Sequence, residues 1–571
     1  PLFRDENSLT FTQNVSWTSG AHEIRFGYDL VKHMLDHWQP EIGSGPRGSF
    51  NFSTSTTSSR DGDYGQTDRH GWASFMLGLP NSTGKSLQWE LMTTNEWQHA
   101  WYIRDRWQAT PNLTFTLGLR YEYYPLVTRD DRGMEVLSLD PTPCPEYGAS
   151  QQCFPLTLGN NIEVSNTLFA PRIGLAYRMG ENNVFRAGYG ITYSPLPFGR
   201  PLRGFYPLTV AGDFSREDGN SFLPFRGLSQ DNAGNGESGI PTFLGPDAGP
   251  GDTVPLPPFV QQRSMPEDKI NRGYIQSWNI VYERKLPSDI VASFGYIGTQ
   301  TTNQLADHQL NWRGPDQDRQ LSQYSNTSIN YWDGWLSMNY HSLQVAINRR
   351  FTNGLFIKAA YTYSKAINMT NDEGWAGLSW NDPALISRNR AQAGYNRPHM
   401  LNIGTIYALP WGQGGGGVGN YLIRDWQLNA IFAVVENTPG GVGTSSQFST
   451  SSNSNTADQV GEVVNLGGKG PGQKYYDPSA FVVNPRDPAL DPSDPNYCTN
   501  LDCYGTTGRN FGLPGPTAVN LDLSIFRTFS ITEDVGLEFR TEIFNFANNP
   551  KFNGPNRSAN SSGFMEITST D

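Results

Sequence analysis

Apolar and polar residues alternate with a period of two along many stretches of this chain. From residue 113 to 123 the pattern sets Leu113, Phe115, Leu117, Leu119, Tyr121 and Tyr123 against Thr114, Thr116, Gly118, Arg120 and Glu122. Successive side chains of a β-strand point to opposite faces, so this segment predicts one apolar and one polar face. The same pattern recurs over 185–193, 355–363, 519–525 and 535–543. We therefore expect a mostly β protein.

The lengths of the links between these segments predict a topology. We expect sixteen strands near 7–17, 22–35, 67–79, 85–93, 97–108, 113–126, 168–179, 183–194, 271–286, 290–305, 340–351, 355–367, 397–410, 425–437, 518–529 and 535–547. Short links alternate with long ones at 36–66, 127–167, 195–270, 306–339, 368–396 and 438–517, with the short link 94–96 as the exception. Outer-membrane barrels have short periplasmic turns and long extracellular loops, whereas a soluble multi-domain β protein has no reason to place every long loop at one end.

The pattern thus predicts a large antiparallel transmembrane β-barrel of the outer-membrane type. The last expected strand, 535–547, runs outward, so a periplasmic C-terminus would need one more inward strand beyond Asp571. A barrel of this size encloses a lumen too wide for its own side chains to fill. We expect residues 1–571 to be part of such a barrel, with its first strands and its closing strand outside this sequence.

Composition supports a membrane barrel and excludes some partners. Aromatic residues reach 13% and charged residues only 17%, and no stretch has the roughly 20 apolar residues of a spanning helix. Closed barrels cross bilayers without such a helix. Aromatic residues gather near the ends of the expected strands, for example Trp101, Trp107 and Trp278, which suits the interfacial girdles of a barrel. The net charge of −12 disfavours nucleic acid as a partner.

The four cysteines form two local pairs in Pro-rich loop sequence. Cys144 and Cys153 are close in sequence, as are Cys498 and Cys503, and we expect two disulfides in an oxidising exterior. Two reduced loop pairs are the alternative. A metal site at the second pair has little support, because no histidine or further cysteine lies near it.

The expected strands place charged residues on the polar face, where we expect them to line the lumen. These residues are Arg120, Glu122, Arg186, Asp522, Glu538, Arg540 and Glu542. Paired carboxylates such as Glu538 and Glu542 can serve a glycosidase, but a polar lumen wall is expected in such barrels anyway. We therefore expect no catalytic residues, no cofactor and no metal, and hence no enzyme.

Ligand capture would fall to the long outer loops and the upper lumen. Two aromatic-rich loop stretches supply the candidate contacts Trp332, Trp335, Trp375 and Trp380. Aromatic faces suit sugars, peptides and other amphipathic ligands. The alternative is that these rings pack the loops onto one another.

Several motifs resemble one family of outer-membrane proteins. They are Tyr-Ile-Arg-Asp-Arg-Trp at 102–107, Thr-Pro-Asn-Leu-Thr at 110–114, Leu-Gly-Leu-Arg-Tyr-Glu at 117–122, Ala-Pro-Arg-Ile-Gly at 170–174, Gly-Arg-Asn at 508–510 with Gly-Pro at 515–516, and Phe-Arg-Thr-Glu-Ile-Phe-Asn-Phe-Ala-Asn-Asn-Pro-Lys-Phe at 539–552. In this order they resemble the Oar-like TonB-dependent receptors, with the last block the most specific. The resemblance covers essentially the whole chain but only the barrel portion of the family.

The resemblance implies a barrel of about 22 strands with a plug in its lumen, of which this chain would hold strands 6 to 21. It further implies location in a bacterial outer membrane, a TonB-type energy-transducing partner that contacts a segment before Pro1, and import, or export, of an extracellular ligand of unknown class. Two other functions stay open. An adhesin or structural barrel would move no cargo, and a diffusion porin would have no plug.

Overall fold

The computed structural model describes most of the chain. The described residues are 3–39, 44–54, 57, 68–88, 91–125, 128–129, 134–145, 152–159, 163–193, 195, 206, 208–215, 251–257, 260, 262–264, 269–314, 319–321, 324, 328–371, 377–412, 417–444, 453–486, 490–499 and 501–570. Within them, no helix is both long enough and apolar enough to cross a membrane.

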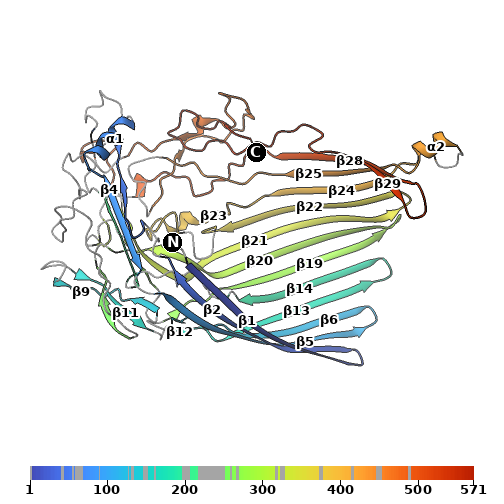
Figure 1. The fold of residues 1–571 in the computed structure, drawn as a ribbon, viewed down its shortest axis with the longest axis horizontal. Helices are drawn as coiled ribbons and strands as arrows, with labels where there is room; N and C mark the ends of the chain where they lie inside the picture. Colours follow the sequence, from blue (N-terminus) through green and yellow to red (C-terminus); the bar gives the residue numbers. More distant parts are fainter. Residues whose placement is uncertain are drawn as a thin grey trace.

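One large antiparallel sheet dominates the molecule (Figure 1). Its fourteen long strands are β1 (Phe3–Ser19), β2 (His22–Trp38), β5 (Met92–Thr110), β6 (Leu113–Tyr123), β13 (Leu168–Met179), β14 (Asn183–Tyr193), β19 (Tyr274–Leu286), β20 (Ile290–Gln309), β21 (Ile329–Thr352), β22 (Leu355–Asn368), β24 (His399–Ala408), β25 (Gln427–Val435), β28 (Ala518–Ser530) and β29 (Gly536–Ile543). Each pairs antiparallel with the next in this order. The fold therefore confirms the predicted up-and-down antiparallel topology.

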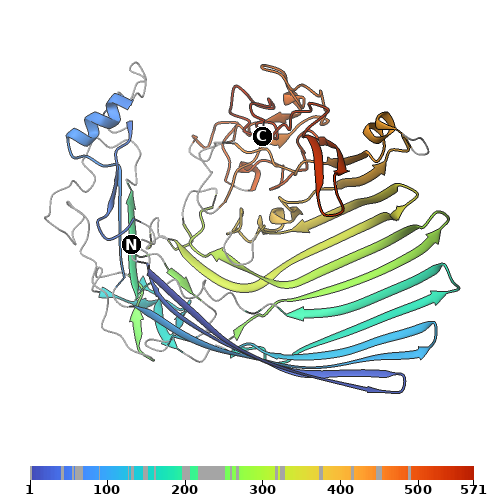
Figure 2. The same cartoon turned by 45° about the vertical axis from the view of Figure 1, so that its right-hand side comes forward.

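The sheet is strongly curved, and its two end strands lie apart (Figure 2). In the described part of the chain β1 pairs with β2, and β29 pairs with β28, while no ladder joins β1 to β29. Every residue of both end strands is exposed. The described residues thus form an open section of a barrel wall, with a concave face and a convex face.

The links confirm that long and short connections sit at opposite ends of the sheet. At the end that we call the turn end, tight turns follow β1, β5, β13, β19 and β21, and Gly20, Asn353 and Gly354 there adopt the positive φ that such turns require. One turn-end link, between β24 and β25, is longer and carries the short helix α2 (Val418–Ile423). The other long links lie at the opposite end, the loop end.

Two of the sixteen predicted strands are not part of the wall. The segment predicted at 67–79 forms helix α1 (Asp68–Met76), because Trp72, Phe75 and Met76 repeat at helical rather than strand spacing. The segment predicted at 85–93 overlaps β4 (Ser82–Gln88), whose partners are two loop strands, β3 (Ser49–Asn51) and β15 (Thr209–Ser215). The short link predicted at 94–96 was the exception to the alternation of short and long links. It does not exist in the structure, because β5 already begins at Met92.

Short strands and coil build a folded layer at the loop end. They include β7 (Thr128–Arg129), β8 (Met134–Leu137), β9 (Thr142–Pro143), β10 (Gln152–Cys153), β11 (Pro155–Gly159), β12 (Glu163–Val164), β16 (Thr253–Pro255), β17 (Gln262–Ser264), β18 (Lys269–Ile270), β23 (Ala391–Gln392), β26 (Asp458–Gln459) and β27 (Phe481–Val482), with 3-10 turns at Ile386–Asn389, Pro478–Ala480 and Leu501–Cys503. Apolar side chains from different loops form separate buried clusters in this layer. The loops are therefore packed against one another.

The convex face has the pattern of a lipid-facing surface. Near the loop end Trp101 contacts Tyr28 and Tyr121, with ring centroids 5.2 and 5.8 Å apart, and near the turn end Trp107 lies 5.6 Å from Phe115. Trp101 and Trp107 are six residues apart on β5, or about 20 Å along the strand. Exposed apolar residues between them, such as Ile103 at 52% exposure, complete a band flanked by two aromatic girdles.

Candidate functional site

The strand register places all seven predicted lumen residues on the concave face. Residues opposite one another in neighbouring strands share a face, so the register can be followed from strand to strand. On β6, Arg120 and Glu122 lie opposite Ala170 and Leu168, and on β14, Arg186 lies opposite Ala176. Asp522 lies on the same face of β28 as Ser524, Phe526 and Thr528. These three residues lie opposite Glu542, Arg540 and Glu538 of β29, which therefore share that face.

At the β28–β29 end the concave face carries a cluster of mixed charge. Arg540 lies 2.8 Å from Glu538 and 4.0 Å from Glu542, and all three side chains are about half exposed. Asp522 accepts a hydrogen bond from the Asn545 backbone N–H at 2.8 Å. A guanidinium between two carboxylates offsets part of their charge, which fits a polar wall better than an acid–base pair.

Between β2 and β14 the concave face is rich in arginine. It carries Arg25, Arg104, Arg106, Arg120, Arg172, Arg178 and Arg186, together with the acids Glu23, Asp29, Glu96 and Glu122. We call this surface the arginine wall. Only Arg120, Glu122 and Arg186 among these residues were predicted from the sequence. Arg104 and Arg172 follow the apolar residues Ile103 and Pro171 of the opposite face, so alternation within β5 and β13 could have indicated them.

Ion pairs within the arginine wall join strands that are far apart in sequence. Glu23 approaches Arg25, Arg104 and Arg106 with N–O distances of 2.9, 3.1 and 3.6 Å. Arg120 donates to both Asp29 and Glu122 at 2.8 Å. Glu23 and Glu122 pair with guanidinium groups on their own or an adjacent strand, whereas the Asp29–Arg120 pair reaches across β5 from β2 to β6. The sheet thereby gains cross-strand polar contacts.

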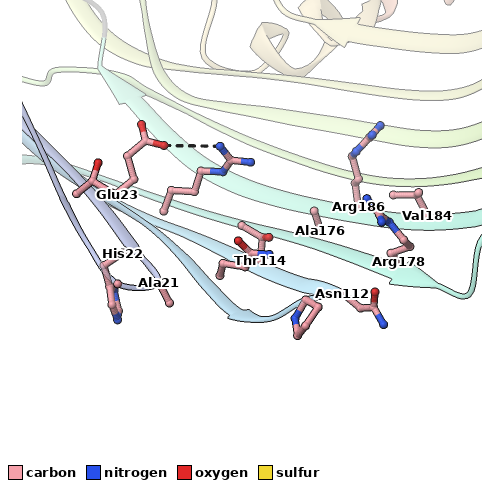
Figure 3. A pocket seen from close by; sticks show the side chains of 14 residues that line it. Ala21, His22, Glu23, Asn112, Thr114, Ala176, Arg178, Val184 and Arg186 are labelled. Carbon is pink, nitrogen blue, oxygen red and sulfur yellow. Dashed lines mark ion pairs between the residues drawn. The ribbon is translucent and has the colours of Figure 1, made fainter.

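Two cavities open along this wall. The first, of about 560 Å³, lies near the turn end and is lined by Glu23, Arg106, Thr114, Arg178 and Arg186, among others. Figure 3 shows Glu23 and Arg186 pointing to one side of the sheet while His22 points to the other. The second, of about 370 Å³, is lined by Arg25, Arg104, Arg120 and Arg172 with Tyr102 and Gly118. Both cavities thus present guanidinium groups to whatever occupies the concave side.

A buried charged cluster lies where the arginine wall meets the loop layer. Glu96 is 2% exposed, Glu122 is 5% exposed and Arg272 is 6% exposed. The Arg272 guanidinium donates to the Tyr124 carbonyl, and burial lowers the pKa of Arg272 to about 10, which leaves it charged at neutral pH. Opposite charges buried together offset part of one another's desolvation cost. This cluster connects the wall to the segment that enters β19.

The loop tryptophans require a correction. Trp332 and Trp380 are each 1% exposed, and they pack in separate buried clusters, with Leu35 and Met92 in one and Leu385 in the other. A ring that is fully covered by other side chains presents no face to a ligand. Trp335 packs beside His308, with ring centroids 5.7 Å apart, and Trp375 lies outside the described residues. Packing therefore accounts for Trp332, which lies on β21, and for Trp380.

Both cysteine pairs form disulfides within the loop layer. Cys144 is joined to Cys153 beside the β9–β10 pair, and Cys498 is joined to Cys503. All four cysteines are buried. The first disulfide precedes Phe154, whose backbone N–H donates to the Tyr324 hydroxyl at 2.7 Å. The disulfides thus join cysteines nine and five positions apart in the sequence.

The curved antiparallel sheet, the lipid-facing convex band and the polar concave face define an outer-membrane β-barrel protein. The chain belongs to the outer membrane beta barrel domain family, whose model matches residues 1–571. It is accordingly a protein of the outer membrane. A comparison with curated proteins gives no match.

Solved structures share parts of this fold at low sequence identity. The outer membrane transporter YddB from Escherichia coli is 10% identical, with a TM-score of 0.48 over 99% of this chain and 52% of that one. The siderophore receptor PiuA from Acinetobacter baumannii is 12% identical, with a TM-score of 0.41 over 99% of this chain and 55% of that one. The ferric-catecholate import receptor Fiu from E. coli K12 is 12% identical, with a TM-score of 0.41 over 98% and 53%. The chain spans about half the length of these structures.

Proposed function

We propose that this chain is barrel wall from a TonB-dependent-receptor-like transporter, which moves a ligand across the outer membrane through a plugged lumen. The supporting observation is the wide polar concave face, which carries charged groups from β2 to β29. A sheet of fourteen long strands is too large for its own side chains to fill the space it would enclose. A plug in the longer protein would occupy that space, and a TonB-type protein would supply the energy.

The motif Phe-Arg-Thr-Glu-Ile-Phe-Asn-Phe-Ala-Asn-Asn-Pro-Lys-Phe at 539–552 supports the Oar-like assignment within this proposal. The folded loop layer is consistent with a receptor, because packed loops can present a fixed surface to an extracellular ligand. The proposed role is transport and not catalysis, with import as the leading direction. The partners would be outer-membrane lipid, the TonB-type protein and an extracellular ligand.

Two measurements on the full-length protein test the proposal. The first is steady ion conductance in planar lipid bilayers, and the second is binding to the purified periplasmic domain of a TonB-type protein. We expect no steady conductance, because a plug closes the lumen, and saturable binding that is lost when the TonB-contacting segment is deleted. Steady conductance without TonB binding would indicate a diffusion porin. Absence of both would indicate an adhesin or structural barrel, and either result would refute the transporter.

A further inference from the structure

The arginine wall has a charge opposite to that of the chain as a whole. The chain carries a formal net charge of −12. On the concave face from β2 to β14, by contrast, seven arginines face four acids, a formal excess of three positive charges. A fifth acid, Glu283 on the next strand, pairs with Arg186 at 2.6 Å. Cations concentrated on one wall attract anions from solution.

Glycine residues keep the arginines of this wall uncovered. One register row across β2, β5, β6, β13 and β14 reads Arg25, Arg104, Gly118, Arg172 and Gly190. A Cβ atom at Gly190 would lie 3.3 Å from Arg172 Cγ, and one at Gly118 would lie 3.8 Å from both Arg104 Cγ and Arg172 Cβ. The aliphatic parts of Arg104 and Arg172 therefore lie against bare backbone, and no side chain at these glycines stands between the guanidinium groups.

Part of the cationic surface has no acid to neutralise it. In the described part of the chain neither Arg172 nor Arg178 forms an ion pair with an acid. The buried Nε of Arg104 also has no hydrogen-bond partner among those residues. Arg172 and Arg178 are six residues apart on β13, which places them about 20 Å apart along the strand. Arg178 lines the first cavity and Arg172 lines the second.

We propose that the arginine wall binds an elongated polyanionic solute, one that bears several carboxylate or phosphate groups along its length. Arginine pairs with both groups through parallel N–H donors, so the shared chemistry is an extended row of anionic oxygens. A single small anion cannot reach both unpaired arginines, whereas an extended polyanion can contact several guanidinium groups at once. The inference rests on the proposed function in that the wall would line the transport path, and it gives that path a charge preference.

Binding of long-chain inorganic polyphosphate, which is longer than the distance between Arg172 and Arg178, to the full-length protein in detergent micelles tests the proposal. The test variant is Arg172→Gln with Arg178→Gln. The matched control is Lys358→Gln with Arg540→Gln, which removes two cations from the same face on the distant strands β22 and β29. Isothermal titration calorimetry at low and high salt gives the affinities, and heat-modifiable gel migration shows that each variant is folded.

We expect the wild-type protein to bind long-chain polyphosphate, with an affinity that falls as salt rises, because exposed charges are screened. The test variant should bind at least roughly tenfold more weakly, and the control should stay within about twofold of wild type. Orthophosphate should bind much more weakly than the long-chain polyphosphate. If the glutamine variant does not fold, Arg172→Lys with Arg178→Lys keeps the charge without the bidentate geometry, and an intermediate affinity is expected.

Three outcomes would overturn the inference: no binding by the wild type, equal loss in the test and control variants, or equal affinity for orthophosphate and long-chain polyphosphate. Unchanged affinity in the lysine variant would refute the bidentate contact. The measurement contains no TonB-type protein, so failure of TonB coupling leaves its result unaffected. Conversely, a transporter that couples to TonB but binds no polyanion would refute only this inference.

Discussion

The two faces of β21 offer a direct test of which side of the sheet meets lipid. Val345 lies on the convex face, opposite Phe294 and Tyr361, and Gln344 lies on the concave face, opposite Gly295 and Thr362. The two positions are adjacent in sequence, and all their cross-strand neighbours are uncharged. An arginine at position 345 and an arginine at position 344 therefore differ mainly in the medium around the side chain.

The register also places Val345 at the centre of the apolar stripe of β21. On the same face His341 and Arg349 each lie four residues away, or about 13 Å along the strand. Arginine on the lipid face at the bilayer midplane costs about 2–4 kcal/mol, and near the interface about 0–1 kcal/mol. Val345→Arg should thus lower the folding equilibrium constant about 30- to 700-fold, while Gln344→Arg and His341→Arg should have much smaller effects.

Urea titration of the full-length protein in lipid vesicles, with heat-modifiable migration as the measure of folded protein, gives these free energies. The wild type and the three arginine variants are compared in the same lipid. If Val345→Arg and Gln344→Arg have equal stabilities, or if Gln344→Arg is the less stable of the two, the assignment of the convex face to lipid is wrong. A large loss in His341→Arg would instead place the membrane boundary farther toward the loop end.

Two further predictions concern the loop layer. The fully buried Asn389 side chain accepts hydrogen bonds from the backbone N–H groups of Ser379 and Trp380 at 2.9 and 3.2 Å, and it donates one to the Trp380 carbonyl at 2.8 Å. Asn389→Ala should therefore lower the free energy of local unfolding by about 2–4 kcal/mol. The rate of amide hydrogen exchange over residues 378–390 should then rise about 30-fold or more. The exposed substitution Asn465→Ala is the near-neutral control. Unchanged exchange in Asn389→Ala would refute the stabilising contribution of the Asn389 hydrogen bonds. Burial raises the pKa of Tyr476 to about 12, above the usual value near 10, so its stabilisation is present below pH 10 and is lost as pH rises through 12. Near-ultraviolet circular dichroism should show the layer loosening in this window, and the Tyr476→Phe variant should lack that component.

Much of the wall could be predicted from alternation alone, because one face of each strand meets lipid and the other meets a polar space. Leu113–Tyr123 and Asn183–Tyr193 form strands within a few residues of the predicted limits. Alternation gave wrong wall strands at 67–79 and 85–93. There the apolar spacing is helical in the first case, and in the second the alternating strand finds its partners among loop strands. Periodicity shows that a face is apolar, but it does not show what covers that face.

The candidate site was predictable only in part. Arg120 and Arg186 could be assigned to the concave face from their own strands, yet the partners of Arg120 include Asp29, which is 91 residues away in sequence. Which arginines remain unpaired, as Arg172 and Arg178 do, depends on the register between strands. A residue's own strand fixes its face, whereas the charges around it come from neighbouring strands.

The sequence by itself determined the two-faced strands, the separation of short turns from long loops, and hence an outer-membrane barrel wall. These properties are local, because side-chain alternation and turn residues act over a few positions. The tertiary structure decided how the loops pack, which covers Trp332 and Trp380, and how seven arginines converge on one wall. Those arrangements depend on register and on contacts between segments far apart in the chain, where the local pattern has no influence.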